Sequence, residues 1–234
     1  GKEEHPTQAL LDMYTIFRTF DFDESSVVRE SRLSRLQSKY PGLDRGAAGK
    51  TYLYCGDIGR GRTVRSLAMV LSRYRNVRMF FVSPDHGVLR MGDDLRQRLK
   101  NAGVEFYEFD SLDSEHDGNA ILAQADCVYM TRIQREHNSP EATSQIESLD
   151  LTPFFLTPQR VALMKDFAPI LHPFPRDSVV GEIPVEIDSD PRAMYFRQAR
   201  NGMWARAALL VHLFDAGEQL YQAYSEIVPS RAAI

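Results

Sequence analysis

Cysteine is scarce in this chain: only Cys55 and Cys127 occur among 234 residues, and each lies near the end of an apolar segment. This usage predicts buried free thiols in a reducing compartment and argues against a disulfide-stapled fold. Long apolar runs are missing too, because no stretch approaches the roughly 18 residues that a membrane helix needs. The first residues, GKEEHPTQ, carry no signal-peptide pattern. We therefore expect a cytoplasmic protein without a membrane partner.

An excess of positive charge is also missing, since 28 Lys and Arg residues stand against 32 Asp and Glu residues, for a net charge of −4. This balance gives no reason to expect a nucleic-acid partner. A content of 43% hydrophobic and 26% charged residues is ordinary for a globular protein. The densest polar cluster, Asp113, Glu115, His116 and Asp117, lacks the spacing of metal ligands and predicts a solvated acidic turn. We expect no metal ion.

The chain begins with a helical pattern and then loses it. Apolar residues recur at helical spacing from Pro6 to Arg18, and proline suits the first turn of a helix. Residues 1–18 are therefore predicted to be a helical segment that carries the motif His-Pro-Thr-Gln. Residues 19–50 are charged, only weakly amphipathic and end in a glycine-rich stretch, which predicts an inserted, exposed helical linker.

From residue 51 the chain alternates between short apolar runs and helical patterns. The predicted strands are Thr51–Cys55, Met79–Ser83, Glu105–Phe109, Cys127–Thr131 and a short run ending near Leu171. The predicted helices are Thr63–Tyr74, Gly87–Ala102, Ala120–Ala125 and Pro158–Lys165, the last with Thr157 as its cap. This alternation predicts an α/β domain over residues 51–200, with a doubly wound parallel sheet flanked by helices. The final segment, 201–234, is predicted to hold one long closing helix from Gly202 to Ile227.

Three glycines, Gly56, Gly59 and Gly61, follow the first predicted strand and allow a tight turn with close approach of the backbone to a ligand. The helix beginning near Thr63 directs its unpaired amide hydrogens at that turn, which favours an anion there, and Arg62 lies at the helix entrance.

Two other interpretations of this turn stay open. It is compatible with a plain glycine turn beside a solvated arginine. A dinucleotide site is the second alternative, because Asp85 follows the next strand as a ribose-binding acid would. However, Val64 occupies the position that the third glycine of G-x-G-x-x-G should hold.

Arginine and glutamine side chains follow a second strand, where Arg132 and Gln134 lie two residues apart and face one side in extended geometry. The carboxyl ends of parallel strands share one edge of the sheet, so Arg62, Arg132 and the segment His172–Pro175 are predicted to meet there. Each guanidinium matches a carboxylate bidentately. Two of them at one crevice predict a small dicarboxylate ligand.

Five segments resemble aspartate carbamoyltransferase in the same order, over most of the chain: HPTQALLDMYTI, GDIGRGRTVRSL, VYMTRIQRE, ILHPFPR and YFRQARNGMWARAALL. The sister family, ornithine carbamoyltransferase, usually has cysteine in place of Thr7 and Pro173, so the aspartate family matches better. The resemblance implies a Rossmann-like aspartate-binding domain, preceded by an interdomain helix. It implies transfer of a carbamoyl group from carbamoyl phosphate to L-aspartate in pyrimidine synthesis, without metal or organic cofactor, by a homotrimer.

The resemblance also implies roles for individual residues. His5 would donate a hydrogen bond to the carbamoyl oxygen and Gln8 would hold the carbamoyl amide, as catalytic residues. By the same resemblance, Arg62 with Thr63 would bind the α-carboxylate of aspartate, and Arg132 with Gln134 would bind its side-chain carboxylate. Main-chain carbonyls of Pro173, Phe174 and Pro175 would accept hydrogen bonds from NH groups of the substrates. Arg206 would support the site structurally.

One part of the resembled family has no counterpart here. Its amino-terminal domain binds carbamoyl phosphate through a Ser-Thr-Arg-Thr-Arg motif and a lysine-bearing loop, and nothing in this sequence matches either. We therefore expect a carboxy-terminal, aspartate-binding half that is inactive alone. The alternative is a non-catalytic module that keeps the fold for assembly with partner subunits, although such a module has no need of His5, Gln8 or the two arginines.

Overall fold

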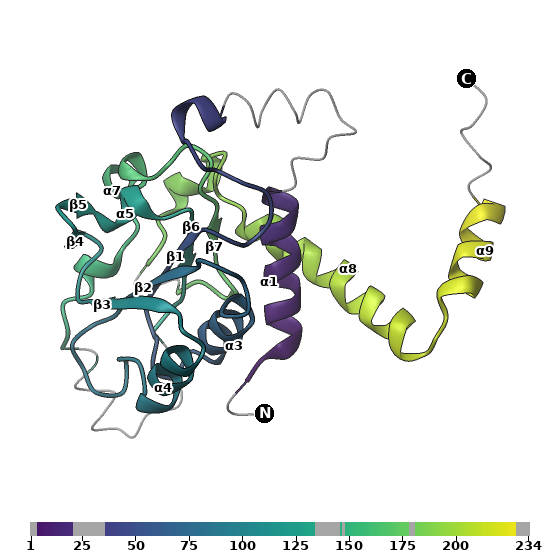
Figure 1. Ribbon diagram of the computed structural model, residues 1–234, viewed down its shortest axis with the longest axis horizontal. Helices are drawn as coiled ribbons and strands as arrows, with labels where there is room; N and C mark the ends of the chain where they lie inside the picture. The colour runs from purple at the N-terminus through teal and green to yellow at the C-terminus, as the bar shows by residue number, and fades with distance from the viewer. Residues whose placement is uncertain (1–3, 21–35, 134–145, 147, 178–180, 228–234) are drawn as a thin grey trace.

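The computed structural model describes residues 4–20, 36–133, 146, 148–177 and 181–227, and its centre is a five-stranded sheet (Figure 1). The strands are β1 Thr51–Cys55, β2 Arg78–Val82, β3 Glu105–Phe109, β6 Cys127–Met130 and β7 Ile170–Leu171. Their order is β3-β2-β1-β6-β7, and every neighbouring pair is parallel. The predicted doubly wound parallel sheet is therefore confirmed, and the first four strands lie within one residue of their predicted bounds.

Helices cover both faces of the sheet. On one face lie α1 Pro6–Thr19, α3 Arg62–Leu71 and α4 Asp93–Asn101, and on the other lie α5 Ile121–Gln124 and α7 Pro158–Leu163. Alternate residues of β1 enter two separate cores, Tyr52 and Tyr54 on the first face and Leu53 and Cys55 on the second. Because both faces of β1 are buried, its sequence is an unbroken apolar run.

The strand order reverses beside β1. The chain passes from β1 to β2 and β3 on one side, then returns to β6 and β7 on the other. In such sheets the loops that follow the two central strands part at the carboxyl edge and leave a crevice between them. Arg62 follows β1 and Arg132 follows β6, so the topology brings both arginines to this edge.

Helix α1 begins as its sequence predicts, with Pro6 at the first position and His5 as N-cap. It packs against α3 and against α8, Tyr195–Leu213. Its inward face buries apolar side chains such as Leu11 and Ile16, and it also buries the carboxyl group of Asp12. This packing fixes the His-Pro-Thr-Gln motif at the entrance of the crevice.

The prediction of one closing helix from Gly202 to Ile227 is wrong. Two helices are present, α8 Tyr195–Leu213 and α9 Gly217–Ile227. Asp215 takes a φ of 50°, Ala216 N donates to Val211 O at 2.9 Å, and Asp215 N donates to His212 O at 3.3 Å. This is a Schellman C-cap with aspartate in the place usually held by glycine. The chain turns there, and α9 lies far from the sheet at the end of α8 (Figure 1).

The described end of the 19–50 insertion is helical at residues 36–39, whereas residues 21–35 lie outside the described part. The sequence predicts an exposed linker, but part of it is packed. Leu36 and Tyr40 contact the core, and the Tyr40 ring lies 4.9 Å from that of Phe167. Helix α8 also crosses residue 200, where the sequence places a boundary. The division into segments therefore stays a prediction.

The remaining elements are short. The predicted acidic turn is a hairpin of β4 Glu115–His116 and β5 Asn119–Ala120, joined by Asp117 and Gly118 with φ of 50° and 72°. The 3-10 helices are η1 Thr152–Phe154 and η2 Val185–Ser189. Within the described residues, no helix has the length and apolar character needed to cross a membrane.

Candidate functional site

A cleft of about 950 Å³ opens at the carboxyl edge of the sheet. It is lined by His5, Gln8, Asp57, Arg60, Gly61, Arg62, Thr63, Thr131, Arg132, His172, Pro173, Phe174 and Pro175. Every cleft residue that the sequence predicts is among these except Gln134, which lies outside the described residues. The structure thus brings together segments that are up to 170 positions apart, from His5 to Pro175.

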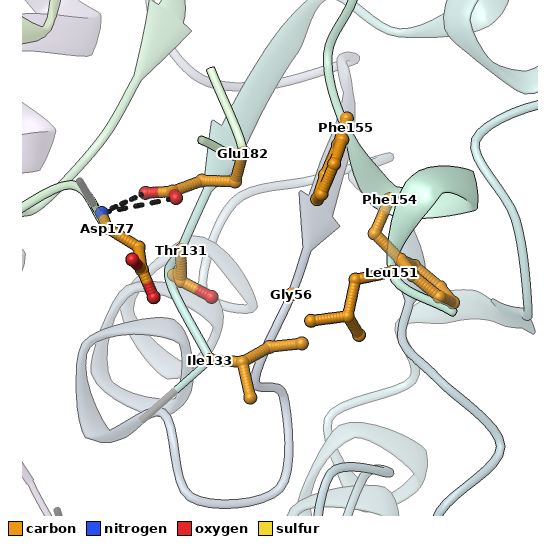
Figure 2. A pocket seen from close by; sticks show the side chains of 8 residues that line it. All are labelled: Gly56, Thr131, Ile133, Leu151, Phe154, Phe155, Asp177 and Glu182. Atoms are coloured by element: carbon orange, nitrogen blue, oxygen red, sulfur yellow. Dashed lines mark hydrogen bonds between the residues drawn. The ribbon is translucent and has the colours of Figure 1, made fainter. Parts of the chain in front are cut away.

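Direct contact between the ends of β1 and β6 sets the width of the cleft. Thr131 N donates to Cys55 O at 2.8 Å, and Asp57 N donates to Thr131 Oγ1 at 3.1 Å. Gly56, between them, has a φ of 119°, and a Cβ there would lie 2.1 Å from Thr131 O (Figure 2). Glycine is therefore required at this position, since any side chain would force the two strand ends apart.

The loop after β1 is held from within. Asp57 is fully buried, and its carboxylate accepts from Arg60 Nε at 3.0 Å and from Arg60 Nη2 at 2.6 Å. Arg60 therefore serves the loop itself, although it borders the cleft. The loop ends at Gly61, which caps α3 without a side chain, so the first amides of α3 and the exposed Arg62 face the cleft region together. That combination favours an anion.

His5 is positioned by both of its neighbouring helices. Its main-chain N–H donates to Ser66 Oγ on α3 at 2.8 Å, and its Nδ1 accepts from Gln8 N at 3.2 Å. Because Nδ1 accepts, the neutral ring carries its proton on Nε2. Burial, and then the charge of Arg62, lower the pKa of His5. The ring is therefore neutral at pH 7 and offers an N–H donor at the cleft.

Gln8 is buried, and a hydrogen bond to Asp12 orients its side-chain amide. Gln8 Nε2 donates to Asp12 Oδ1 at 2.8 Å. Oε1 is then the atom that a ligand in the cleft meets. His5 and Gln8 lie three residues apart at the start of α1 and both line the cleft, so a donor and an acceptor stand side by side.

The His172–Pro175 turn forms another part of the cleft wall. The His172 ring is buried, with Nε2 2.9 Å from Glu182 Oε1 and Nδ1 accepting from Phe174 N at 2.9 Å. Burial lowers the pKa of His172 despite the carboxylate beside it. Phe174 has a φ of 53°, and its ring lies 5.9 Å from that of Tyr195. These contacts fix the main-chain carbonyls of the turn.

Arg206 lies beside the cleft but does not line it. Its guanidinium folds back along α8, where Nη1 would lie 2.7 Å from a Cβ on Gly202. Its charge contributes to the lowered pKa of His5, after burial and Arg62. Within the described part of the chain Arg206 has no ion-pair partner.

A much smaller hollow of about 10 Å³ adjoins the cleft (Figure 2). Gly56, Thr131, Ile133, Leu151, Phe154, Phe155, Asp177 and Glu182 line it. In Figure 2 the Glu182 carboxylate points at Asp177 N, from which it accepts at 3.1 and 3.2 Å. A hollow of this size holds about one water molecule at most, so it is part of the wall of the site.

Three buried residues behind the cleft were not predicted from the sequence: Asp12, Gln198 and Glu182. One signal was available for Asp12, because it stands one helical turn after Gln8 on the inward face of α1. The partners of Gln198 and Glu182 come from other elements, so no local pattern marks them.

Comparison with known proteins gives the same picture as the geometry. The family model for the Asp/Orn binding domain of aspartate/ornithine carbamoyltransferase matches residues 48–213. The chain belongs to this family. The chloroplastic aspartate carbamoyltransferase of Arabidopsis thaliana is 38% identical over 215 residues, which are 90% of this chain and 44% of that protein.

Solved structures of relatives agree with this family assignment. The catalytic subunit of M. jannaschii aspartate transcarbamoylase is 32% identical, with a TM-score of 0.66 over 93% of this chain and 58% of that one. The Trypanosoma cruzi aspartate transcarbamoylase in complex with carbamoyl aspartate and phosphate is 29% identical, with a TM-score of 0.65 over 90% and 54%. The chain spans about half the length of the relatives it matches.

Proposed function

We propose that this chain is the aspartate-binding half of an aspartate carbamoyltransferase of pyrimidine biosynthesis. The reaction transfers the carbamoyl group of carbamoyl phosphate to the amine of L-aspartate and releases phosphate. The single observation that carries the proposal is the cleft of about 950 Å³ that combines Arg62, Arg132, His5 and Gln8. The T. cruzi relative in complex with carbamoyl aspartate supports a ligand with two carboxylates and a carbamoyl group.

The two arginines bind the two carboxylates of aspartate. Arg62, with Thr63 and the first amides of α3, takes the α-carboxylate, since helix N-termini and guanidinium groups both favour an anion. Arg132, from the loop after β6, takes the side-chain carboxylate, and Gln134 is its proposed helper. Each charged hydrogen bond contributes about 1.5–3 kcal/mol, so both arginines are needed for useful affinity.

The donor and acceptor on α1 bind the carbamoyl group. His5 donates from Nε2 to the carbonyl oxygen and stabilises the negative charge that develops there as the amine attacks, an effect worth about 3 kcal/mol per donor. Gln8 Oε1 accepts from the carbamoyl NH2. Carbonyls of the Pro173–Pro175 turn accept from the attacking amine. The amine attacks the carbonyl carbon directly, so no side-chain nucleophile is required. Phosphate leaves with the electron pair of the broken C–O bond and takes up the proton that the amine loses. Catalysis therefore rests on placement.

In this proposal a further domain, the carbamoyl-phosphate-binding half, completes the enzyme. Large apolar side chains are exposed along α1 and α8, among them Leu10, Tyr14, Met203 and Trp204, of which Trp204 is 59% exposed. Helices α1 and α8 pack against each other, and exposed apolar surface of this kind is typical of an interaction site. We assign it to the carbamoyl-phosphate-binding half, and we propose a homotrimer that shares sites between subunits. Arg206, close to this surface, braces the site from α8.

The proposed compartment is the cytoplasm, and it rests on the two cysteines. Both are buried free thiols, and burial raises the pKa of each. Such thiols suit a reducing compartment. The A. thaliana relative is named chloroplastic. Fractionation of the cell of origin tests the proposed compartment, and recovery of the protein with an organelle would contradict it.

A complementation assay tests the proposed function. The chain is mixed with a separately produced carbamoyl-phosphate-binding domain of an aspartate carbamoyltransferase, and formation of N-carbamoyl-L-aspartate from carbamoyl phosphate and L-aspartate is measured. We expect turnover by the mixture and none by either part. The matched control is Arg65→Ala, an arginine on α3 that pairs with Asp94 outside the cleft, which keeps activity, whereas Arg62→Ala loses it.

The assay also separates the two functions considered. Turnover by the chain alone would show that it carries its own carbamoyl-phosphate site, against our proposal. A mixture that associates but never turns over, with no effect of L-aspartate on association, would favour the non-catalytic assembly module.

A further inference from the structure

Asp12 lies beneath the cleft and accepts hydrogen bonds from three elements. It is 0% exposed. Its Oδ1 accepts from Gln8 Nε2 at 2.8 Å and from Gln198 Nε2 at 2.6 Å, and its Oδ2 accepts from the Tyr129 hydroxyl at 2.8 Å. Gln8 is on α1, Tyr129 on β6 and Gln198 on α8. Asp12 itself does not line the cleft, so any effect it has on a ligand acts through these partners.

The direction of each bond follows from one main-chain amide. His172 N–H can only donate, so the atom of Gln198 that faces it at 2.8 Å is Oε1. The other end of the Gln198 amide, Nε2, therefore faces Asp12 Oδ1, and this oxygen must accept. Because the same oxygen also faces the amide of Gln8, Gln8 must direct Nε2 at it. Oε1 of Gln8 is then the end that belongs to the cleft.

We propose that Asp12 is a positioning residue that fixes the Gln8 amide with its oxygen toward the ligand, and thereby makes the site select a carbamoyl group over an acyl group of the same shape. The inference rests on the proposed function and deepens it. A carbamoyl group offers one carbonyl acceptor and one amide NH2 donor. The neutral His5 Nε2–H meets the first, and Gln8 Oε1 meets the second. An acetyl group, with a methyl in place of the amide NH2, fills the same space but leaves Gln8 Oε1 without a donor.

An inverted Gln8 amide would lose this selection. It would direct NH2 at the ligand NH2, so two donors would face each other and the preference for the carbamoyl group would disappear. A group that accepts at the position of Asp12 Oδ1 prevents the inversion. Selection is therefore built by a side chain that never touches the ligand.

The acceptor at Oδ1 does not depend on the charge of Asp12. Burial raises the pKa of Asp12 to about 7, against the three hydrogen bonds that favour the ionised form. A proton on Asp12 is accommodated at Oδ2, because the Tyr129 hydroxyl lies 2.8 Å from that oxygen and a hydroxyl group can accept a hydrogen bond instead of donating one. Oδ1 remains a carbonyl oxygen in either state. Asparagine keeps that oxygen, whereas leucine of similar shape removes it.

Calorimetric titration with a matched ligand pair tests the inference. N-carbamoyl-L-aspartate and N-acetyl-L-aspartate, which differ only in an amide NH2 against a methyl group, are titrated into the 234-residue chain and its Asp12→Asn and Asp12→Leu variants. We expect about a tenfold preference for the carbamoyl ligand, the value of one additional hydrogen bond. The preference should persist in Asp12→Asn and fall close to one in Asp12→Leu, with both carboxylates still bound.

One control variant and one replacement variant exclude the explanation that Asp12→Leu only destabilises the fold. Tyr54→Phe deletes a buried hydroxyl that lacks a partner among the described residues, beside the Tyr129 ring at 5.9 Å, and should keep the tenfold preference. If Asp12→Leu fails to fold, Asp12→Ser replaces it, because a hydroxyl one atom shorter cannot reach both amides and should also lose the preference. Loss of stability alone would lower the binding of both ligands without changing their ratio.

The outcomes distinguish this inference from the proposed function. A folded Asp12→Leu or Asp12→Ser chain that keeps the preference overturns the role of Asp12, as does an Asp12→Asn chain that loses it, while ligand binding by the wild type still supports the proposed function. A wild-type chain that binds neither ligand overturns both.

Discussion

Replacing Gly56 by alanine tests the contact that holds the two arginine loops together. A Cβ at this position would lie 2.1 Å from Thr131 O and 2.6 Å from Thr131 Oγ1, whereas ordinary contacts begin at 3.4 Å. The end of β1 must therefore move away from β6 by about 1 Å. The φ of 119° adds backbone strain, because L-residues rarely adopt it.

The expected cost follows from these two terms. Overpacking in a tight contact costs about 1–3 kcal/mol, and a residue held in a sparsely populated backbone region costs about 1–3 kcal/mol. We expect Gly56→Ala to lower the free energy of unfolding by about 3 kcal/mol or more. Gly87→Ala is the matched control, since nothing lies within 4 Å of its Cβ and its φ is not positive. It should change stability by less than about 1 kcal/mol.

Urea unfolding followed by circular dichroism measures both variants, with the midpoint and the slope fitted together. A Gly56→Ala chain as stable as the Gly87→Ala chain would refute the close approach of β1 to β6. The folded fraction of Gly56→Ala should also bind L-aspartate analogues more weakly, because the strand ends that carry Arg62 and Arg132 are displaced.

Three further predictions concern the surroundings of the cleft. Burial raises the pKa of Asp12 from its ordinary 3.8 to about 7, so the folded chain holds a proton that the unfolded chain has lost, and stability falls as the pH rises. The free energy of unfolding should fall relative to that of Asp12→Asn by roughly 4 kcal/mol between pH 4 and pH 8. A constant difference in urea unfolding across this range would contradict this prediction. The charge of Arg62 lowers the pKa of His5 after burial does, so Arg62→Ala should raise that pKa in an NMR titration, and an unchanged value would oppose the geometry. Phe174→Leu removes the packing of the Phe174 ring against Tyr195, whose ring centre lies 5.9 Å away, and should lower the free energy of unfolding by about 1 kcal/mol. Ligand affinity should stay unchanged, because the turn contacts the ligand through its main chain. A large loss of affinity would contradict this prediction.

The sheet and the meeting of the two arginine loops were predictable from the sequence because their signals are local. Each central strand is a short apolar run with turn residues after it, and β1 is apolar throughout because both of its faces are buried. Once the strands are placed, the rule for parallel sheets puts Arg62 and Arg132 at one edge. Resemblance supplied the roles of His5 and Gln8, which no spacing could have supplied alone.

The rest depends on contacts between distant residues or on an unusual local choice. Gln198 meets Asp12 across 186 positions of sequence, so neither residue carries a sign of the other. The break between α8 and α9 was missed because Asp215 takes the left-handed conformation at which glycine is expected. The packing of Tyr40 on Phe167 likewise arises only when the chain is folded.

Binding of a plain dicarboxylate tests the central claim most directly, that each of two arginines takes one carboxylate of a single ligand. Succinate and butyrate, which differ by one carboxylate, are titrated calorimetrically into the wild type, Arg62→Ala and Arg132→Ala. We predict that the wild type binds succinate more tightly than butyrate, and that either substitution lowers succinate affinity about tenfold or more, toward that of butyrate. Succinate affinity that survives either substitution would contradict the account.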